Sequence, residues 1–236
     1  MCNDNPYTWQ DATVIWADMA ISEDTAMALL PPGIRPAASP CVTFFIADYP
    51  HTSYGFSYHE AAVWVHAVDD SGELQHCPWM LVDDDQALVL GRELMGFPKM
   101  LGEISLHSDG QHALGRAVRK GREMLRIEGS LASDHVQPPV LFDKRVINLV
   151  GSSLVGLSYL EYGAGGERFH TCRRGQGSIT VASNPMLPEI APESPCDIWL
   201  ATMDISDSRK DNPMTVGAQI EDDAWVQARY LTQTFS

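Results

Sequence analysis

The sequence predicts a β-rich fold, made mainly of strands with a few short helices. Runs of β-branched and aromatic residues recur along the chain between turn residues, which is typical of strands. Helix signals are confined to two short stretches, and no repeat, low-complexity tract or clear linker interrupts the chain. Because a chain of 236 residues fits one domain, we expect residues 1–236 to form a single domain.

The first strand candidate is residues 41–47, a run of β-branched and aromatic side chains. Residues 61–68 form a second such run, which ends at the turn sequence Asp-Asp-Ser-Gly. Residues 125–129 alternate apolar and polar side chains, as a half-buried strand does. The remaining candidates are residues 79–82, 101–107, 177–182, 197–204 and 224–235. This spacing indicates a barrel-like β core.

Two short helices are expected between these strands. Residues 22–30 begin with a capping serine and two acids, and a pair of prolines follows them. Residues 85–94 also begin with acids, and a glycine and a proline follow shortly after them. Lys99 is therefore expected on a loop just past the C-terminus of the second helix.

The charge and hydropathy of the chain exclude several classes of partner. A formal net charge of −15 argues against nucleic acid, whose phosphates need a basic surface, and against an anionic membrane face. The longest apolar region, residues 146–160, is too short and too polar to span a bilayer. The N-terminus has neither the basic nor the apolar region of a signal peptide. We therefore expect a cytoplasmic protein that binds no nucleic acid and no membrane.

No metal or cofactor is expected. The five cysteines are scattered, and no Cys-x-x-Cys pair occurs. His51, His59 and Glu60 lie within one short segment, but their spacing matches no metal-ligand signature. The chain also lacks a phosphate-binding loop and a dinucleotide-binding fingerprint.

Lys99 is the residue with the clearest chemical signal. It is one of four lysines and the one whose neighbours are apolar, apart from small glycines. A lysine with an ordinary pKa near ~10.4 is almost entirely protonated at pH 7 and is a poor nucleophile. Burial disfavours the charged form, and a neutral lysine amine can attack a ketone to form a Schiff base. The alternative is an exposed lysine whose stem covers apolar neighbours.

The segment around Lys99, residues 91–102 with the sequence GRELMGFPKMLG, resembles the active-site segment of the acetoacetate decarboxylase family. In that family the lysine that follows an aromatic residue and a proline forms the Schiff base. The resemblance implies one β-rich domain with a cone-like β-barrel core, assembled into homo-oligomers. It also implies a small-molecule carbonyl substrate.

The resemblance assigns roles to three further residues. Glu60 falls on the glutamate that lies near the family's lysine, where a carboxylate can move protons or orient the carbinolamine. Phe97 takes the aromatic position before the proline, and Met80 falls in the stretch that lines the family's apolar pocket. Met95 and Met100 are expected to keep water from the lysine. The alternative for Glu60 is an exposed side chain without a catalytic role. The alternative for the apolar residues is an ordinary position in the core.

The chain also departs from the family. Met100 replaces the second lysine that usually follows the catalytic one. Residues 7–18 contain no arginine or lysine, although the family carries a substrate-binding arginine in its N-terminal strand. Phe45 stands where the family has a further carboxylate. Acetoacetate itself is therefore a doubtful substrate.

Three functions are consistent with these observations. The first is a carbon–carbon lyase that decarboxylates a β-keto acid, larger and more apolar than acetoacetate, through an iminium on Lys99. The second is aldolase-dehydratase chemistry on a keto acid or aldehyde with the same lysine. The third is a non-catalytic binding protein that has kept the fold.

Overall fold

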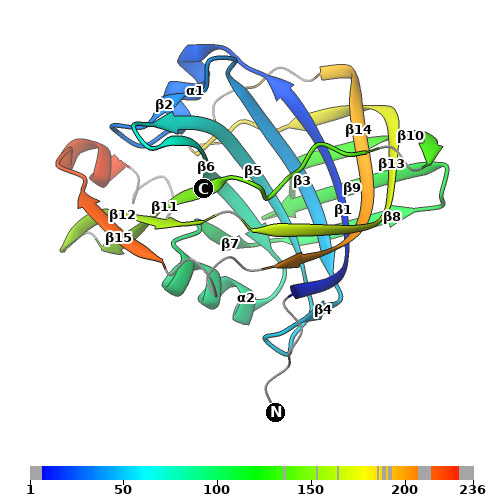
Figure 1. The fold of residues 1–236 in the computed structure, drawn as a ribbon, viewed down its shortest axis with the longest axis horizontal. Helices are drawn as coiled ribbons and strands as arrows, with labels where there is room; N and C mark the ends of the chain where they lie inside the picture. Colours follow the sequence, from blue (N-terminus) through cyan, green and yellow to red (C-terminus); the bar gives the residue numbers. More distant parts are fainter. Residues whose placement is uncertain are drawn as a thin grey trace.

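The structure is a computed structural model that describes residues 7–134, 137–152, 154–163, 165–184, 186–187, 190, 193–206 and 214–228. One sheet dominates it (Figure 1). Its strands are β1 (Tyr7–Ala20), β2 (Arg35–Pro36), β3 (Cys41–Tyr49), β4 (His51–Thr52), β5 (Tyr58–Asp69), β6 (Gly72–Val82), β7 (Lys99–Leu101), β8 (Glu103–Ser108), β9 (His112–Arg119), β10 (Arg122–Asp134), β11 (Arg145–Ser152), β12 (Gly156–Tyr162), β13 (Gly166–Val181), β14 (Glu193–Ser206) and β15 (Thr215–Gln219).

The expected mainly-β fold is confirmed. The main pairing path runs β15-β12-β11-β6-β5-β3-β1-β14-β13-β10-β9-β8, and within the described residues it has two free ends rather than closing on itself. The sheet bends strongly, so that β8, β9 and β10 cross behind β1, β3 and β5 (Figure 1). This curl resembles part of a barrel, but the hydrogen-bonded path stays open.

Each central strand contributes to two cores, because successive side chains of a strand point to opposite faces. On β3, for example, Phe44 and Ile46 pack into the core inside the curl, toward β9 and β10. Phe45 and Ala47 pack into a second core on the other face, against residues of β11, β12 and β14. We call these the inner core and the outer core. The candidate site lies in the outer core.

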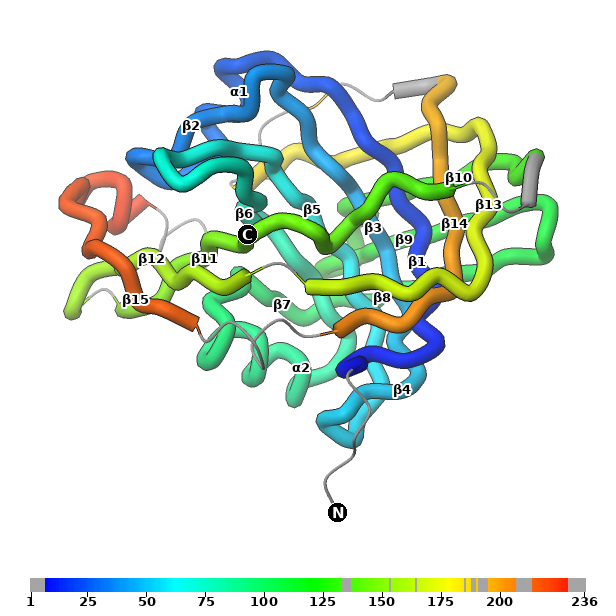
Figure 2. Tube along the Cα trace, viewed as in Figure 1, coloured from blue at the N-terminus to red at the C-terminus, as the bar shows by residue number. Residues whose placement is uncertain are grey.

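Strand β6 is where three segments meet. It pairs with β5 along one edge. Along its other edge it pairs with β11 near its start, at Leu74 and Gln75, and with β7 at its end, from Met80 to Val82. Both of these pairings are parallel, and they bring β7 and β11 to the same edge of one strand (Figure 2).

The two expected helices are present. α1 (Glu23–Leu29) is capped by Ser22, whose side chain accepts a hydrogen bond from the backbone N–H of Thr25 at 3.1 Å. α2 (Asp85–Val89) is capped in the same way by Asp84 and continues directly into a π-helix, Leu90–Leu94. The second expected helix therefore has the right extent but changes its hydrogen-bonding pattern halfway.

Two predictions of secondary structure were wrong. Lys99 is the first residue of β7 rather than part of a loop, because Met80 offers it a strand partner. The expected strand at residues 224–235 is helical over residues 223–228, and its remainder lies outside the described residues. Asp222 starts this helix by accepting a hydrogen bond from the backbone N–H of Trp225, and Val226 then packs with Leu157 and Ile220. Tertiary packing thus outweighs the strand propensity of these residues.

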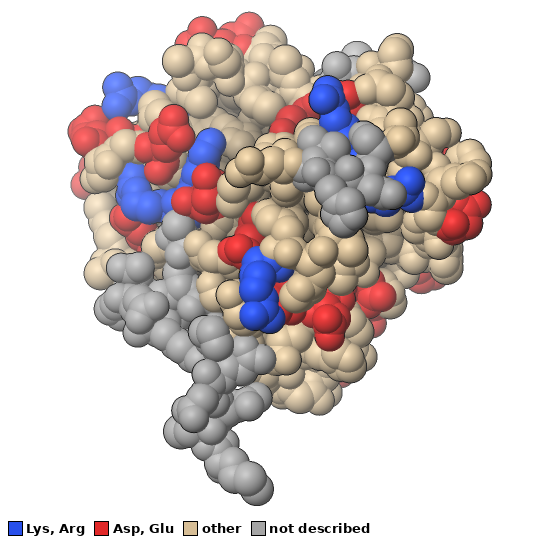
Figure 3. All heavy atoms as spheres, turned by 45° about the vertical axis from the view of Figure 1, so that its right-hand side comes forward, with Lys and Arg blue, Asp and Glu red and all other residues tan. Residues whose placement is uncertain are grey.

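The surface agrees with the acidic composition. On the face shown in Figure 3, basic side chains lie beside acidic ones, and no broad basic patch is visible. Among the described helices, none has the length and apolar character that a membrane crossing requires.

Candidate active site

Glu60 and Lys99 form a buried ion pair. Lys99 Nζ lies 2.9 Å from Glu60 Oε2, and the two side chains are 6% and 8% exposed. Glu60 comes from β5 and Lys99 from β7, so the lysine side chain reaches across β6 to the carboxylate. An unpaired charge at such a depth would be costly, and the pairing offsets part of that cost.

A glycine makes room for this lysine. A Cβ atom placed on Gly91 would lie 2.4 Å from Cδ and Cε of Lys99, so the lysine stem passes over a backbone that carries no side chain. Gly91 belongs to the π-helix, and its carbonyl oxygen also accepts the backbone N–H of Phe97 at 3.0 Å. Arg92 donates a hydrogen bond from Nη1 to the carbonyl oxygen of Lys99 at 3.0 Å. The segment thus fixes both the backbone and the stem of the lysine.

Two tyrosines complete the polar part of the site. Tyr49 lies on β3, next to the strand that carries Glu60, and lines the same pocket. The ring of Tyr58 lies 5.0 Å from Lys99 Nζ, and its hydroxyl accepts a hydrogen bond from Trp9 Nε1 at 3.0 Å. Burial, and then the charge of Glu60, raise the pKa of both tyrosines well above the ordinary value. Both phenols therefore stay protonated over the physiological pH range.

The pair opens into a pocket with a volume of about 90 Å³. Its walls are mainly aromatic. The lining residues are Trp9, Tyr49, Phe56, Tyr58, Glu60, Trp64, Ala87, Leu90, Met95, Phe97, Lys99, Phe142, Val146, Tyr162, Gly163, Gly165, Ile205 and Ser206. Among these described residues, Glu60 and Lys99 are the charged ones.

The structure brings four of the six sequence-predicted site residues to this pocket: Lys99, Glu60, Phe97 and Met95. Met80 lies in the outer core as the strand partner of Lys99, but it is not among the lining residues. Met100 does not line the pocket either, because it follows Lys99 on a strand and points to the opposite face, into the inner core. The expectation that Met100 shields the lysine is therefore wrong.

Sequence reasoning missed most of the aromatic wall. Trp9, Tyr49, Phe142 and Tyr162 come from distant parts of the chain, and no local motif marks them. One signal was available, since Tyr58 and Trp64 differ from Glu60 by even numbers of residues along β5. Period-two alternation allows these side chains to share a face.

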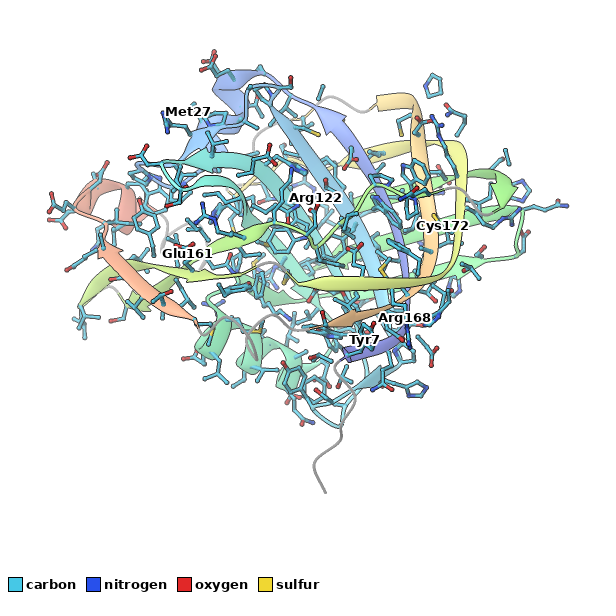
Figure 4. The ribbon with its side chains drawn as sticks, viewed as in Figure 1. Tyr7, Met27, Arg122, Glu161, Arg168 and Cys172 are labelled. Atoms are coloured by element: carbon cyan, nitrogen blue, oxygen red, sulfur yellow. The ribbon has the colours of Figure 1, made fainter. Side chains whose placement is uncertain are left out.

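The described pocket offers no second cation for a substrate carboxylate. β1 contributes Trp9 to the wall rather than a basic residue, as residues 7–18 led us to expect. Arg168 of β13 lies beside the start of β1, with its guanidinium 4.6 Å from the Tyr7 ring (Figure 4). It is more than half exposed and pairs with Asp204 instead of lining the pocket. Phe45, at the position of the family's further carboxylate, stacks on Trp64.

A second carboxyl group, that of Glu167, supports the pocket wall from behind. Glu167 Oε1 accepts the backbone N–H groups of Leu141, at 2.9 Å, and Phe142, at 2.6 Å. Burial raises the pKa of Glu167 to about 7, although these two hydrogen bonds act in the opposite direction. Glu167 therefore changes its charge close to neutral pH, directly behind the wall residue Phe142.

Comparison with known proteins gives a consistent result. The sequence model of the family described as acetoacetate decarboxylase matches residues 2–191. A curated relative, decarboxylase DEC1 of Cochliobolus heterostrophus, is 25% identical over 140 residues, which cover 56% of this chain and 54% of that protein. The match thus spans about half the length of the relative.

Solved structures share the fold at low sequence identity. The acetoacetate decarboxylase of Legionella pneumophila superposes with a TM-score of 0.74 and 16% identity, covering 91% of this chain and 88% of that chain. The enduracididine biosynthesis enzyme MppR, complexed with the condensation product of pyruvate and imidazole 4-carboxaldehyde, gives a TM-score of 0.69 and 16% identity, with 90% of each chain covered.

Proposed function

Because the chain belongs to the acetoacetate decarboxylase family, we propose that it is a Schiff-base-forming carbon–carbon lyase in which Lys99 is the nucleophile and Glu60 moves protons. The observation that carries this proposal is the buried contact of 2.9 Å between Lys99 Nζ and Glu60 Oε2, at the edge of a pocket. The proposal retains a single domain over residues 1–236, a small carbonyl substrate and a homo-oligomer.

The chemistry starts with a proton transfer from the Lys99 ammonium to Glu60. The neutral amine then attacks the carbonyl carbon of the substrate, and Glu60 returns the proton to the carbinolamine oxygen, which leaves as water. The resulting iminium accepts the electron pair of the bond to the carboxylate carbon. Carbon dioxide leaves, the enamine is protonated at carbon, and water releases the ketone and the free lysine.

The pocket favours a β-keto acid that is larger and more apolar than acetoacetate. Aromatic side chains form most of its wall, and rings such as Phe97 and Tyr162 offer apolar area rather than hydrogen bonds to a substrate. None of the described lining residues is an arginine, so the pocket has no guanidinium to bind a second charged group of the substrate. Loss of carbon dioxide also disperses the carboxylate charge, which an apolar pocket assists.

The alternative is aldolase-dehydratase chemistry with the same iminium. The absence of a second cation among the described lining residues favours it, because neutral carbonyl compounds need no such partner. One structural neighbour, MppR, is described in complex with a condensation product of pyruvate and an aldehyde. In this version the Lys99 iminium loses a proton to give an enamine, which attacks an aldehyde.

Reductive trapping tests the proposal. The protein is incubated with acetoacetate, benzoylacetate, a long-chain 3-oxo acid, or pyruvate with an aromatic aldehyde. Borohydride is then added, and the mass gain is mapped to a peptide. We expect an adduct on Lys99 that is lost in Lys99→Arg, which keeps the charge but not the nucleophile, and kept in Lys120→Arg.

The products separate the alternatives. Release of carbon dioxide with the larger keto acids supports decarboxylation, whereas an adduct with carbon–carbon coupling and no carbon dioxide supports the aldolase version. The absence of an adduct on Lys99 with every compound, in a folded protein, would overturn the Schiff-base proposal and leave a binding role.

A further inference from the structure

We propose that Trp64 is a specificity-determining residue of this site: its indole N–H donates a hydrogen bond to a neutral oxygen atom of the substrate, on the chain beyond the ketone. The substrate is then an oxygen-bearing keto acid rather than a plain hydrocarbon one. This role rests on the proposed Schiff-base function and deepens it, because it names the class of substrate that the same pocket takes.

The indole nitrogen of Trp64 is a buried donor without an acceptor. Trp64 is 3% exposed, and no described residue offers an acceptor within hydrogen-bonding distance of its Nε1 atom. Buried indole N–H groups usually have a partner, because an unpaired buried donor lowers stability. Trp9, which lines the same pocket, shows the ordinary case, since its Nε1 donates to the hydroxyl oxygen of Tyr58 at 3.0 Å.

The indole ring of Trp64 lines the pocket close to the reactive amine. Trp64 follows Glu60 by four residues on β5, so the two side chains lie on the same face of the strand. The centre of the Trp64 ring and the Nζ atom of Lys99 each lie 5.8 Å from the centre of the Phe97 ring. They are therefore no further apart than twice that distance. A substrate chain of a few bonds, attached to Lys99, reaches the indole.

The acceptor for this N–H has to come from a molecule in the pocket. The ring contacts that Trp64 makes are apolar, since Phe45 stacks on it at 6.4 Å and Phe97 meets it edge to face. A ligand that displaces water from a buried donor loses affinity unless it brings an acceptor of its own. A hydrocarbon chain leaves the N–H unpaired, whereas an oxygen atom at the same place satisfies it.

The surroundings of the donor select a neutral oxygen. Among the described lining residues the charged ones are Lys99 and Glu60, and both are engaged at the reacting end of the substrate. A carboxylate beside Trp64 would have a single neutral donor in apolar surroundings, which is unfavourable. A ketone, ester or ether oxygen carries no charge and is satisfied by one donor. These are the groups that we expect on the substrate chain.

Trp9 is the matched control. It contributes an indole ring to the same pocket wall, but its N–H is already bonded to Tyr58. Trp64→Phe and Trp9→Phe each replace one indole by a smaller ring. The first variant removes an unpaired donor, and the second removes a donor that already has its acceptor. A change in pocket size affects both variants, whereas loss of a substrate hydrogen bond affects the first.

The first measurement does not depend on decarboxylation. Protein labelled with ¹⁵N in its indoles is titrated by NMR with three pairs of methyl ketones. In each pair an ether oxygen replaces one CH₂ group, progressively further from the carbonyl: methyl propyl ketone with methoxymethyl methyl ketone, methyl butyl ketone with methoxyethyl methyl ketone, and methyl pentyl ketone with methoxypropyl methyl ketone.

The Trp64 indole proton, assigned by its loss in Trp64→Phe, should move downfield with an ether-bearing ketone and not with its hydrocarbon partner. The Trp9 proton should respond equally to both members of a pair. For that pair, the ratio of the two Kd values should change about tenfold against the ether in Trp64→Phe, which corresponds to the loss of one hydrogen bond. It should stay at the wild-type value in Trp9→Phe.

The second measurement uses the β-keto acids whose decarboxylation yields these ketones. The ratio of kcat/KM for the ether-bearing acid to that for its hydrocarbon partner should fall about tenfold in Trp64→Phe. It should stay unchanged in Trp9→Phe, whatever the absolute rates of that variant. Because each ratio compares two substrates on the same protein, a loss of folded enzyme does not alter it.

Equal ratios in wild type and Trp64→Phe for all three pairs, or an equal fall in both tryptophan variants, would overturn the role of Trp64. If Trp64→Phe does not fold, benzothienylalanine at position 64 keeps the shape of the ring without the donor, and the same ratios decide. If the wild type forms no adduct with any carbonyl compound, the Schiff-base function fails, and the NMR comparison still decides whether Trp64 binds a ligand oxygen.

Discussion

The Cα atom of Gly91 lies directly against the side chain of Lys99. A Cβ atom at this position would come within 2.4 Å of Cδ and Cε and within 3.0 Å of Nζ. The glycine is thus part of the site although it carries no functional group. Its contribution is the space through which the lysine reaches Glu60.

Gly91→Ala should displace the amine without harming the fold. Alanine is favoured over glycine inside a helix by about 1 kcal/mol, and the atoms it meets belong to a flexible side chain. Because small displacements of a reacting group can cost ~100-fold in rate, we expect adduct formation on Lys99 to fall at least tenfold. The rate of reductive trapping and the thermal unfolding midpoint check this.

Gly217→Ala serves as the control for Gly91→Ala. Gly217 lies on β15, and a Cβ there would make an ordinary contact of 3.4 Å with Tyr159. This variant should trap at the wild-type rate. If Gly91→Ala also forms the Lys99 adduct at the wild-type rate, Lys99 does not need the space at position 91 in order to react.

Met95 and Met100 are about equally buried, with exposed fractions of 6% and 4%. Truncation of the two side chains to alanine should nevertheless affect substrate preference differently. Both alanine variants lose about 2–5 kcal/mol of stability, the usual cost of emptying a core position. Met95 lines the pocket, so Met95→Ala should also raise the rate with bulky keto acids relative to small ones. Met100→Ala should leave that ratio unchanged. Ratios of kcat/KM for two substrates, measured for each folded variant, decide between them.

Asn148 should prove essential to the pocket wall. It is fully buried, and its Nδ2 donates to the carbonyl oxygen of Met95 at 3.0 Å and to the hydroxyl oxygen of Tyr162 at 3.1 Å. Asn148→Ala removes both donors, and we expect a loss of about 3 kcal/mol in the free energy of unfolding. Asn148→Asp keeps the shape but cannot donate when ionised, so it should be at least as damaging in denaturant titrations. Full stability of either variant would contradict this.

Glu167 should make the stability of the protein depend on pH. Burial raises its folded pKa to about 7, above the ordinary value of 4.5. Its contribution to stability is therefore fully present below pH 4.5 and is lost as the pH rises through 7. Glu167→Gln does not titrate. The difference in unfolding free energy between variant and wild type should grow in favour of the variant by about 2 kcal/mol from pH ~5 to pH ~8. A constant difference would show that Glu167 does not titrate in this range.

The sequence was sufficient to predict most of the central strands and to single out Lys99 and Glu60, which the structure places in contact. Lys99 stood out by its apolar neighbours, and Glu60 by the resemblance to a family segment. The strands at residues 41–47 and 61–68 lie within β3 and β5. Both faces of these strands are largely buried, and the runs are apolar apart from Thr43 and His66. Such patterns are local and can be recognised from the sequence alone.

The parts that could not be predicted depend on contacts between distant residues. β1 mixes polar residues with tryptophans, and its long strand partners, β3 and β14, supply the pairing that the local pattern does not indicate. Met100 was misplaced because Lys99 was expected on a loop. On a strand, adjacent side chains point to opposite faces, and the error follows from that single assignment.

The two-sided burial of β7 has a consequence for heat inactivation. Lys99 and Met100 are adjacent, yet one belongs to the outer core and the other to the inner core. Neither core can unfold without releasing the strand that carries Lys99. Heating should therefore abolish Lys99 trapping at the same temperature as cooperative unfolding of the sheet, with no earlier phase in which a folded protein has lost its site.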